Sequence, residues 1–229
     1  MKPIFAMHSN IERATSLVTS LIERDKGIPG LGLIYGPPGV GKTRFAVWLA
    51  DKVGGIFVRA LAAATTRSFL QDFVFELNIE PAYRASDIYR QAERSLSESP
   101  RLCIIDEVDR LTARWQAVEI LRDLSDRTGS PILLIGMAES ERKLARFQHF
   151  FYRMKSHIMR FTPLSEADVR GFVDQVCEVQ LEDSAIAEIY KVTGGRIGDI
   201  IAELYKAERI ARANDLKVVE GIHLRRRAA

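Results

Sequence analysis

The stretch that decides the fold runs from residue 36 to residue 43 and reads Gly36-Pro37-Pro38-Gly39-Val40-Gly41-Lys42-Thr43. It matches the pattern G-x-x-x-x-G-K-[ST], in which glycines let successive backbone N–H groups turn inward around phosphate oxygens. Lys42 adds a full positive charge, and the Thr43 hydroxyl is suited to Mg²⁺. The run therefore predicts a phosphate-binding loop, with Arg44 as a further contact just beyond it.

The flanks of this loop favour that interpretation over a glycine turn of purely structural role. Residues 31–35 are an apolar run that predicts a strand, and residues 42–52 have a helical pattern. A phosphate loop needs this order of strand, loop and helix, because the helix N-terminus must face the phosphates.

A second motif reads Leu102-Cys103-Ile104-Ile105-Asp106-Glu107. The apolar residues predict a buried strand that carries two carboxylates to its C-terminal tip, where open α/β sheets bind ligands. Asp106 is expected to hold Mg²⁺, and Glu107 to orient and deprotonate an attacking water. An ordinary surface pair is the alternative. The adjacent carboxylates favour hydrolysis over phosphoryl transfer to a small molecule, so a kinase of this loop type is a weaker hypothesis.

Apolar runs alternate with helical patterns in the first two thirds of the chain, which predicts a parallel α/β sheet. The expected strands are 31–35, 56–60, 102–106, 132–136 and 156–161, and the main expected helices are 10–24, 42–52, 68–78, 87–98 and 115–128. After Pro163 the pattern is purely helical, over 166–178, 182–192 and 197–213. We therefore expect two domains, an α/β domain at 1–162 and a helical lid at 163–229 with a basic tail, Arg225-Arg226-Arg227.

The composition is that of an ordinary globular protein, with 229 residues of which 47% are apolar and 28% charged. We expect a cytoplasmic protein without a membrane partner, because no apolar run reaches the ~18 residues that span a bilayer and no secretory signal is visible. The two cysteines, Cys103 and Cys177, are expected as free thiols. A net charge of +3 permits contact with nucleic acid without requiring it. No guanine-reading motif Asn-Lys-x-Asp occurs, which disfavours a GTPase.

In this order, the loop, the carboxylate-tipped strand and the helical C-terminal region resemble the AAA+ ATPases, and the resemblance covers nearly the whole chain. It implies a five-stranded sheet ordered 5-1-4-3-2 and a site for ATP and Mg²⁺ at a subunit interface. It also implies homo-oligomeric assembly into rings or helical filaments.

Other positions follow from the resemblance alone. The family places a polar first sensor at the end of strand four, but residues 135–139 read Ile-Gly-Met-Ala-Glu, so that sensor is absent or moved. The family also places an arginine finger, which acts in the site of a neighbouring subunit, just before strand five. We prefer Arg153 to Arg146 for this role. The alternative for each is a solvated surface arginine. Arg196 matches the second sensor of the lid; the alternative is a helix-start arginine bound to a local acid.

Within AAA+, three short runs are similar to the transposition ATPases, namely phage Mu transposition protein B, TnsC and the TniB proteins. They are residues 134–139, 194–199 and 64–70. This resemblance implies ATP-dependent assembly on double-stranded DNA, target selection, and recruitment and activation of a cognate transposase. The alternatives are a switch of the replication-initiator or helicase-loader kind and a secretion-associated ATPase.

The DNA contacts are expected at Arg59, Thr65, Thr66 and Arg67. Hydroxyls and cations of this kind bind backbone phosphates. The alternative for the 65–67 run is a capped helix start on the surface. The C-terminal arginines are interpreted either as added phosphate affinity or as a solubilising tail.

Overall fold

The computed structural model describes residues 1–25, 27–112 and 115–224. The chain divides into two compact units. We call residues 14–38 and 42–161 the α/β unit, and residues 1–13, 39–41 and 162 onward the helical unit. The predicted division into domains at residue 162 stays a prediction, and the C-terminal arginines 225–227 lie outside the described residues.

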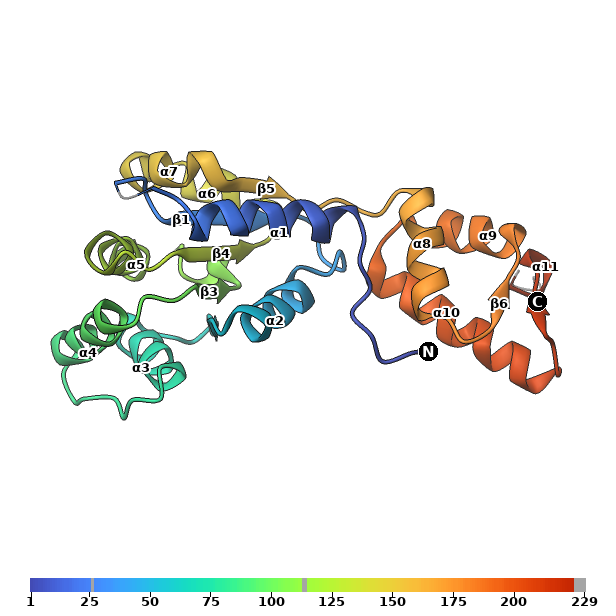
Figure 1. Cartoon of the computed structure of the whole chain (residues 1–229), viewed down its shortest axis with the longest axis horizontal. Helices are drawn as coiled ribbons and strands as arrows, with labels where there is room; N and C mark the ends of the chain where they lie inside the picture. The colour runs from blue at the N-terminus through green and yellow to red at the C-terminus, as the bar shows by residue number, and fades with distance from the viewer. Residues whose placement is uncertain (26, 113–114, 225–229) are drawn as a thin grey trace. The chain divides into compact units, whose positions relative to one another are not determined.

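The α/β unit is built on a parallel sheet of five strands in the order β2-β3-β4-β1-β5, which confirms the expected order (Figure 1). The strands are β1 (Leu31–Tyr35), β2 (Ile56–Arg59), β3 (Cys103–Asp106), β4 (Ile132–Gly136) and β5 (Ile158–Arg160). In this order β1 lies between β4 and β5, so the loop that follows Tyr35 leaves from the middle of the sheet.

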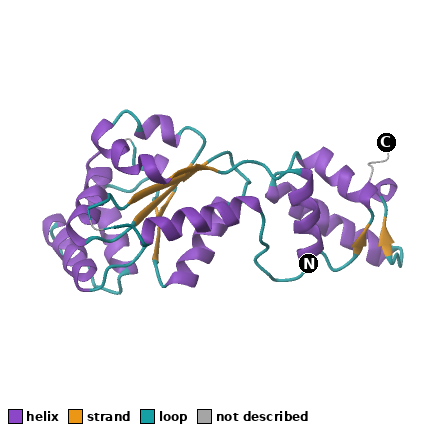
Figure 2. Cartoon of the chain, turned by 45° about the horizontal axis from the view of Figure 1, so that its top comes forward, coloured by secondary structure: helices purple, strands orange, loops and turns teal. Residues whose placement is uncertain are grey.

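Helices cover both faces of this sheet (Figure 2). They are α1 (Ser9–Ile22), α2 (Lys42–Val53), α3 (Thr66–Glu76), α4 (Ala85–Glu98), α5 (Trp115–Thr128), α6 (Ser140–Leu144) and α7 (Gln148–Met154), with the short 3-10 turns η1 (Val108–Arg110) and η2 (Lys155–His157). The long helices lie within two residues of their predicted bounds. Helices α6 and α7 and the turn η1 were not predicted, and β5 is shorter than expected because residues 155–157 form η2.

The core of the α/β unit follows from the alternation of side chains along each strand. Leu31, Leu33, Cys103 and Ile105 point to one face, where apolar residues of α3, α4, α5 and α7 cover them. On the opposite face Gly32 lies against Leu21 of α1. Complete burial of each such aliphatic side chain stabilises the fold by about 1.5–3 kcal/mol.

The helical unit contains α8 (Glu166–Val176), α9 (Asp183–Thr193), α10 (Ile197–Ala213) and α11 (Gly221–Leu224). The expectation of a purely helical region is wrong in one respect, because β6 (Gln180–Leu181) and β7 (Val218–Val219) pair in parallel. Strands of two residues are too short to produce a periodic pattern, and their pairing depends on the way α9 and α10 bring them together.

The N-terminal segment belongs to the helical unit and packs on α8. Gln175 exchanges two hydrogen bonds with the backbone of Met7, through its oxygen and its nitrogen (2.9 Å each). The hydroxyl of Ser9 donates to Asp168 (2.9 Å), whose own carboxylate takes part in the capping box with Ser165 that begins α8. Within the helical unit, Met7 and Ser9 are thereby joined to α8.

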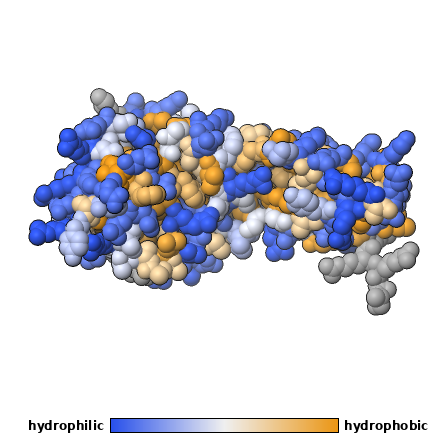
Figure 3. All heavy atoms as spheres, turned by 90° about the horizontal axis from the view of Figure 1, so that it is seen from below, coloured by the Kyte–Doolittle hydropathy of each residue, from blue (hydrophilic) through white to orange (hydrophobic). Residues whose placement is uncertain are grey.

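The surface is that of a polar protein. Figure 3 shows hydrophilic side chains over much of the face that it presents, with smaller apolar patches between them. None of the helices in the described residues is long and apolar enough to cross a membrane.

Candidate functional site

The loop of residues 36–43 joins the end of β1 to the first residue of α2. Gly39 and Gly41 have φ values of +79° and +90°, in the left-handed region that glycine adopts without steric cost. At Gly36 a Cβ atom would lie 2.3 Å from the carbonyl oxygen of Phe161, so no other residue fits there without displacement. These glycines allow the tight backbone turn that a phosphate-binding loop needs.

Lys42 is the buried cation of this loop, with 8% of its surface exposed. Its ammonium donates to the carbonyl oxygens of Gly36 (2.8 Å) and Pro37 (2.7 Å). The pKa of Lys42 is lowered, mainly by burial. The negative charges of Asp106 and Asp109 act in the opposite direction and offset part of this effect. The position suits a phosphate oxygen, because a charged acceptor binds an ammonium more strongly than a carbonyl does.

Thr43 and Asp106 bring two oxygen ligands together at the mouth of the loop. The Thr43 hydroxyl donates to Asp106 Oδ2 (2.9 Å), and Asp106 is buried at the tip of β3. A hydroxyl and one carboxylate fit Mg²⁺, which is bound in proteins by few side chains together with waters and substrate phosphates. Bound there, Mg²⁺ would neutralise charge on the phosphates of ATP. In the described residues no cluster of three or more acidic, His or Cys side chains offers another metal site.

Glu107 follows Asp106 in a left-handed backbone conformation, with φ 57° and ψ 41°. This conformation costs a non-glycine residue about 1–2 kcal/mol, and such strain is frequent at functional sites. The backbone N–H of Glu107 donates to Asp106 Oδ1 (2.9 Å), and its carboxylate is a third exposed. The partial exposure allows this carboxylate to accept a proton from a water held near the phosphates.

Two arginines flank the Glu107 carboxylate. Arg110, on η1, forms an ion pair with it and donates to the carbonyl oxygen of Ala60 (3.3 Å). Arg59, at the end of β2, lies 3.7 Å from Asp106 and 3.9 Å from Glu107. Arg110 was not predicted from the sequence, although its i,i+3 spacing from Glu107 was a usable signal. The structure brings Arg59 to the carboxylates, and its role as a DNA contact stays a prediction.

The run Thr65-Thr66-Arg67 begins α3. Thr65 and Ser68 form a capping box, with the Thr65 hydroxyl accepting from the backbone N–H of Ser68 (3.1 Å). The guanidinium of Arg67 lies 4.8 Å from the centre of the Tyr83 ring. The capped helix start is therefore present. It leaves Arg67 exposed, and a contact between this run and DNA phosphates stays a prediction.

The two candidates for the arginine finger differ in their surroundings. Arg153, on α7, forms an ion pair with Asp126 of α5 (3.1 Å), and its side chain is 34% exposed. Arg146 is exposed between α6 and α7. Either arginine must reach a second copy of the chain to act as a finger, and for Arg153 the pair with Asp126 must open first.

Arg196 is the residue before α10 and forms an ion pair with Asp199 (2.8 Å). This is the local acid that the alternative interpretation requires. The first turn of α10 also contacts residues 39–41, which belong to the same unit, because Gly198 N donates to the Gly39 oxygen (3.0 Å). Arg196 therefore lies next to the turn of α10 that binds Gly39. Its role as a second sensor stays a prediction.

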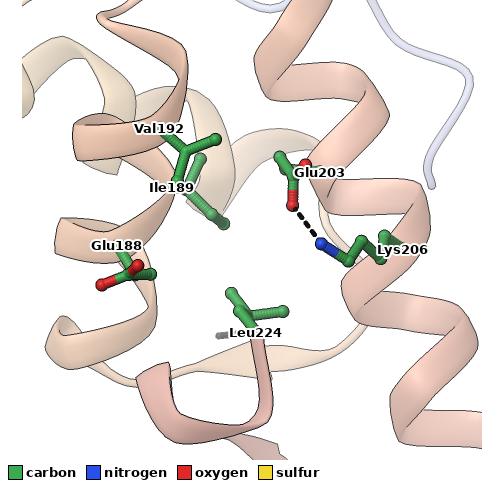
Figure 4. Close-up of a pocket in the computed structure, with 6 residues that line it drawn as sticks. All are labelled: Glu188, Ile189, Val192, Glu203, Lys206 and Leu224. Atoms are coloured by element: carbon green, nitrogen blue, oxygen red, sulfur yellow. Dashed lines mark hydrogen bonds and ion pairs between the residues drawn. The ribbon is translucent and has the colours of Figure 1, made fainter. Parts of the chain in front are cut away.

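A hollow lies in the helical unit, among α9, α10 and α11 (Figure 4). Its polar groups include the ion pair between Lys206 and Glu203 (3.0 Å). The lining residues are Glu188, Ile189, Val192, Glu203, Lys206 and Leu224. With its lysine already paired and a second glutamate present, this hollow does not suit a phosphate.

The chain resembles known proteins over part of their length. It is 26% identical to the replication factor C large subunit of Sulfurisphaera tokodaii over 174 residues, 71% of this chain and 34% of that protein. It is 32% identical to the proteasome-activating nucleotidase of Methanocaldococcus jannaschii over 93 residues, 41% of this chain and 18% of that protein. The chain thus spans about a third or less of the length of these relatives.

The fold of the Aeropyrum pernix ORC1 protein, solved in complex with DNA, is similar at a TM-score of 0.65 and 17% identity, covering 93% of this chain and 62% of that one. This likeness concerns the fold alone. Residues 26–144 match the family described as AAA domain, and these 119 residues (144 − 26 + 1) are more than half of the 229. Together with the loop and the carboxylate pair, this match means that the chain belongs to the AAA domain family of ATPases.

Proposed function

We propose that this chain is an ATP-driven switch that binds DNA and works as a homo-oligomer, in the manner of a replication initiator or clamp loader. The observation that carries the ATPase part is the convergence of Lys42, Thr43 and Asp106 beside Glu107. The Thr43 hydroxyl lies 2.9 Å from Asp106, and the buried ammonium of Lys42 lies on the same loop. These residues are arranged to hold a nucleoside triphosphate with Mg²⁺ next to a general base.

The residues divide the work as follows in this proposal. The loop residues 36–43 and Arg44 bind the phosphates, and Thr43 and Asp106 hold Mg²⁺. Glu107 deprotonates the attacking water, after its ion pair with Arg110 loosens. A neighbouring chain supplies Arg153, or else Arg146, to stabilise the charge that develops on the transferred phosphoryl group.

DNA as the partner is supported by the relatives. One is named as a replication factor C subunit, and the ORC1 protein was solved in complex with DNA. The net charge of +3 is compatible with such a partner. In this proposal Arg67, Thr65 and Thr66 contact backbone phosphates, together with Arg59 where it is not engaged by the carboxylates.

A role in DNA transposition is the second candidate. It rests on the three short runs at 64–70, 134–139 and 194–199, which are similar to transposition ATPases. In that case the protein partner is a cognate transposase. We place this candidate second because the proteins described above, a replication factor C subunit, a proteasome-activating nucleotidase and an ORC protein, include no transposition protein.

The test is ATP hydrolysis by the purified chain with and without duplex DNA, alongside sedimentation in ATP or ADP. We expect hydrolysis that DNA stimulates, and larger assemblies with ATP than with ADP. Glu107→Gln should lower hydrolysis by about 100-fold or more while ATP binding persists. Lys42→Ala should abolish ATP binding, whereas Lys52→Ala, at the exposed end of the same helix, should not.

The outcomes separate the parts of the proposal. Full hydrolysis by Glu107→Gln would remove Glu107 as the base. Hydrolysis that DNA leaves unchanged, with no assembly on DNA, would contradict the DNA-bound switch and direct the search to a protein partner. Uniform coating of any duplex by ATP-bound chains would favour the transposition candidate, and discrete complexes of few chains would favour the initiator-like one.

A further inference from the structure

Asp109 lies two residues beyond Glu107, on η1, and binds the end of a different strand. Its Oδ2 accepts from the backbone N–H of Met137 (2.6 Å), which directly follows β4. The same oxygen accepts from the hydroxyl of Ser140 (2.7 Å), the first residue of α6. The other oxygen faces the ammonium of Lys143 (3.4 Å). The turn after β3 is thus tied to the tip of β4.

The packing at this point is close and depends on a glycine. Ser140 is fully buried, and a Cβ atom on Gly136 would lie 2.0 Å from its hydroxyl oxygen. The side chain of Asp109 is 13% exposed, and its bond with the buried Ser140 hydroxyl is the more shielded from water, because Met137 is an exposed residue. Loss of the acceptor would leave the buried hydroxyl of Ser140 without a partner, which gives the contact a strong preference for one geometry.

The contact between Asp109 and the end of β4 helps to hold the backbone of Glu107 in its left-handed conformation. A residue other than glycine stays in the left-handed region only when its surroundings hold it there. Upstream, the N–H of Glu107 is bound to Asp106 Oδ1 (2.9 Å). Downstream, η1 is a single turn, closed by the bond from Arg110 N to Glu107 O (2.9 Å), and Asp109 anchors that turn to β4. With the second anchor removed, Glu107 can relax to an ordinary conformation and its carboxylate moves.

We propose that Asp109 is a positioning residue for Glu107, which it holds in place by joining the turn after β3 to Met137 and Ser140 at the end of β4. Residues 135–139 supply no Asn, Ser or Thr side chain at this strand end. The polar link comes instead from Ser140 on α6 and Asp109 on η1. This inference rests on the proposed hydrolysis of ATP and assigns Asp109 no contact with the nucleotide.

The experiment compares Asp109→Leu, Asp109→Asn and Ser140→Ala with the unaltered chain, in hydrolysis and in binding of ADP with Mg²⁺. Asp109→Leu should lower kcat by about 100-fold, as expected for a misplaced base, while the Kd for the nucleotide changes less than about twofold. Asp109→Asn should keep kcat within about threefold, because a single amide oxygen has two lone pairs and can accept from both Met137 and Ser140. Ser140→Ala, which keeps only the Met137 bond, should fall between them.

Asp123→Leu is the matched control, since Asp123 is a half-exposed carboxylate on α5 paired with Arg122. It should leave kcat unchanged. Equal losses in Asp109→Asn and Asp109→Leu would overturn the inference, because charge rather than position would then matter. A parallel loss of nucleotide binding in Ser140→Ala would overturn it as well, because it would indicate a general structural role. An unaltered chain without hydrolysis would instead contradict the proposed function.

Discussion

His157 is a buried imidazole of the α/β unit, on η2, with 7% of its surface exposed. Its Nδ1 has no hydrogen-bond partner among the described residues. Burial lowers the pKa of His157, and the positive charge of Arg24 lowers it further. The folded chain therefore favours the neutral imidazole, while the unfolded chain protonates it near its ordinary pKa of about 6.5.

We expect acid to destabilise the protein through this residue. Below about pH 6.5 the unfolded state binds more protons than the folded state, so the free energy of unfolding falls as pH falls and is fully recovered above that pH. His157→Leu should flatten the dependence of the urea midpoint on pH between 7 and 5.5. His149→Leu, at an exposed position of α7, is the control and should leave that dependence unchanged. An unchanged dependence in His157→Leu would show that other groups cause it.

At this scale the sequence predicted that the residues of its two local motifs would lie together, while their roles in the site stay predictions. The structure brings together Lys42, Thr43, Asp106 and Glu107, because each motif stands at the C-terminal end of a strand of the same parallel sheet. Asp109 was not predicted, since its partners lie about 30 residues away and are brought near only by the order of β3 and β4. Tertiary partners of this kind leave no spacing pattern in one sequence.

Among the elements, the turn between α9 and α10 depends on one glycine. Gly195 has a φ of +77°, and a Cβ atom there would lie 2.1 Å from the carbonyl oxygen of Leu164. The Gly195 oxygen also accepts from Leu164 N (2.8 Å), so this turn is joined to the segment that enters α8.

Gly195→Ala should destabilise the helical unit by about 2–4 kcal/mol, from the left-handed backbone and the backbone clash together. Gly171→Ala is the matched control in the same unit. Gly171 is an exposed residue inside α8, where an added Cβ meets nothing within 4 Å, so alanine should stabilise by about 0.5–1 kcal/mol. Urea unfolding of the two variants measures both effects. A Gly195→Ala variant as stable as the parent would mean that the turn can open without cost.

The long elements were predictable because their apolar residues repeat with a clear period. The bounds of β1, β4, α5 and α10 agree with the prediction. The elements that were missed are short: α6 and α7 have five and seven residues, and β6 and β7 two each. A segment of one or two turns has too few residues to display a period, and its conformation is decided by packing instead.

At the scale of the whole molecule, the proposed function requires an arginine of one chain to act in the site of a neighbouring chain. Arg153 pairs with Asp126 of its own chain, at 3.1 Å. Such a pair, with both side chains a third exposed, contributes little stability, about 0–1 kcal/mol, so it can open when a neighbour's nucleotide offers stronger negative charge. Arg146 can act without opening the pair between Arg153 and Asp126. It lies on the segment between the short helices α6 and α7.

Mixing two inactive variants distinguishes these arginines. The Arg153→Ala variant has an intact Glu107 but lacks the finger, and the Glu107→Gln variant lacks the base but has an intact Arg153. In a 1:1 mixture a quarter of the interfaces join an intact site to an intact finger, so hydrolysis should recover to roughly a quarter of the parent rate. Arg142→Ala, an exposed residue of α6, should be active without mixing. Recovery with Arg146→Ala but not with Arg153→Ala would transfer the role to Arg146, and recovery with neither would mean that hydrolysis is completed within one chain.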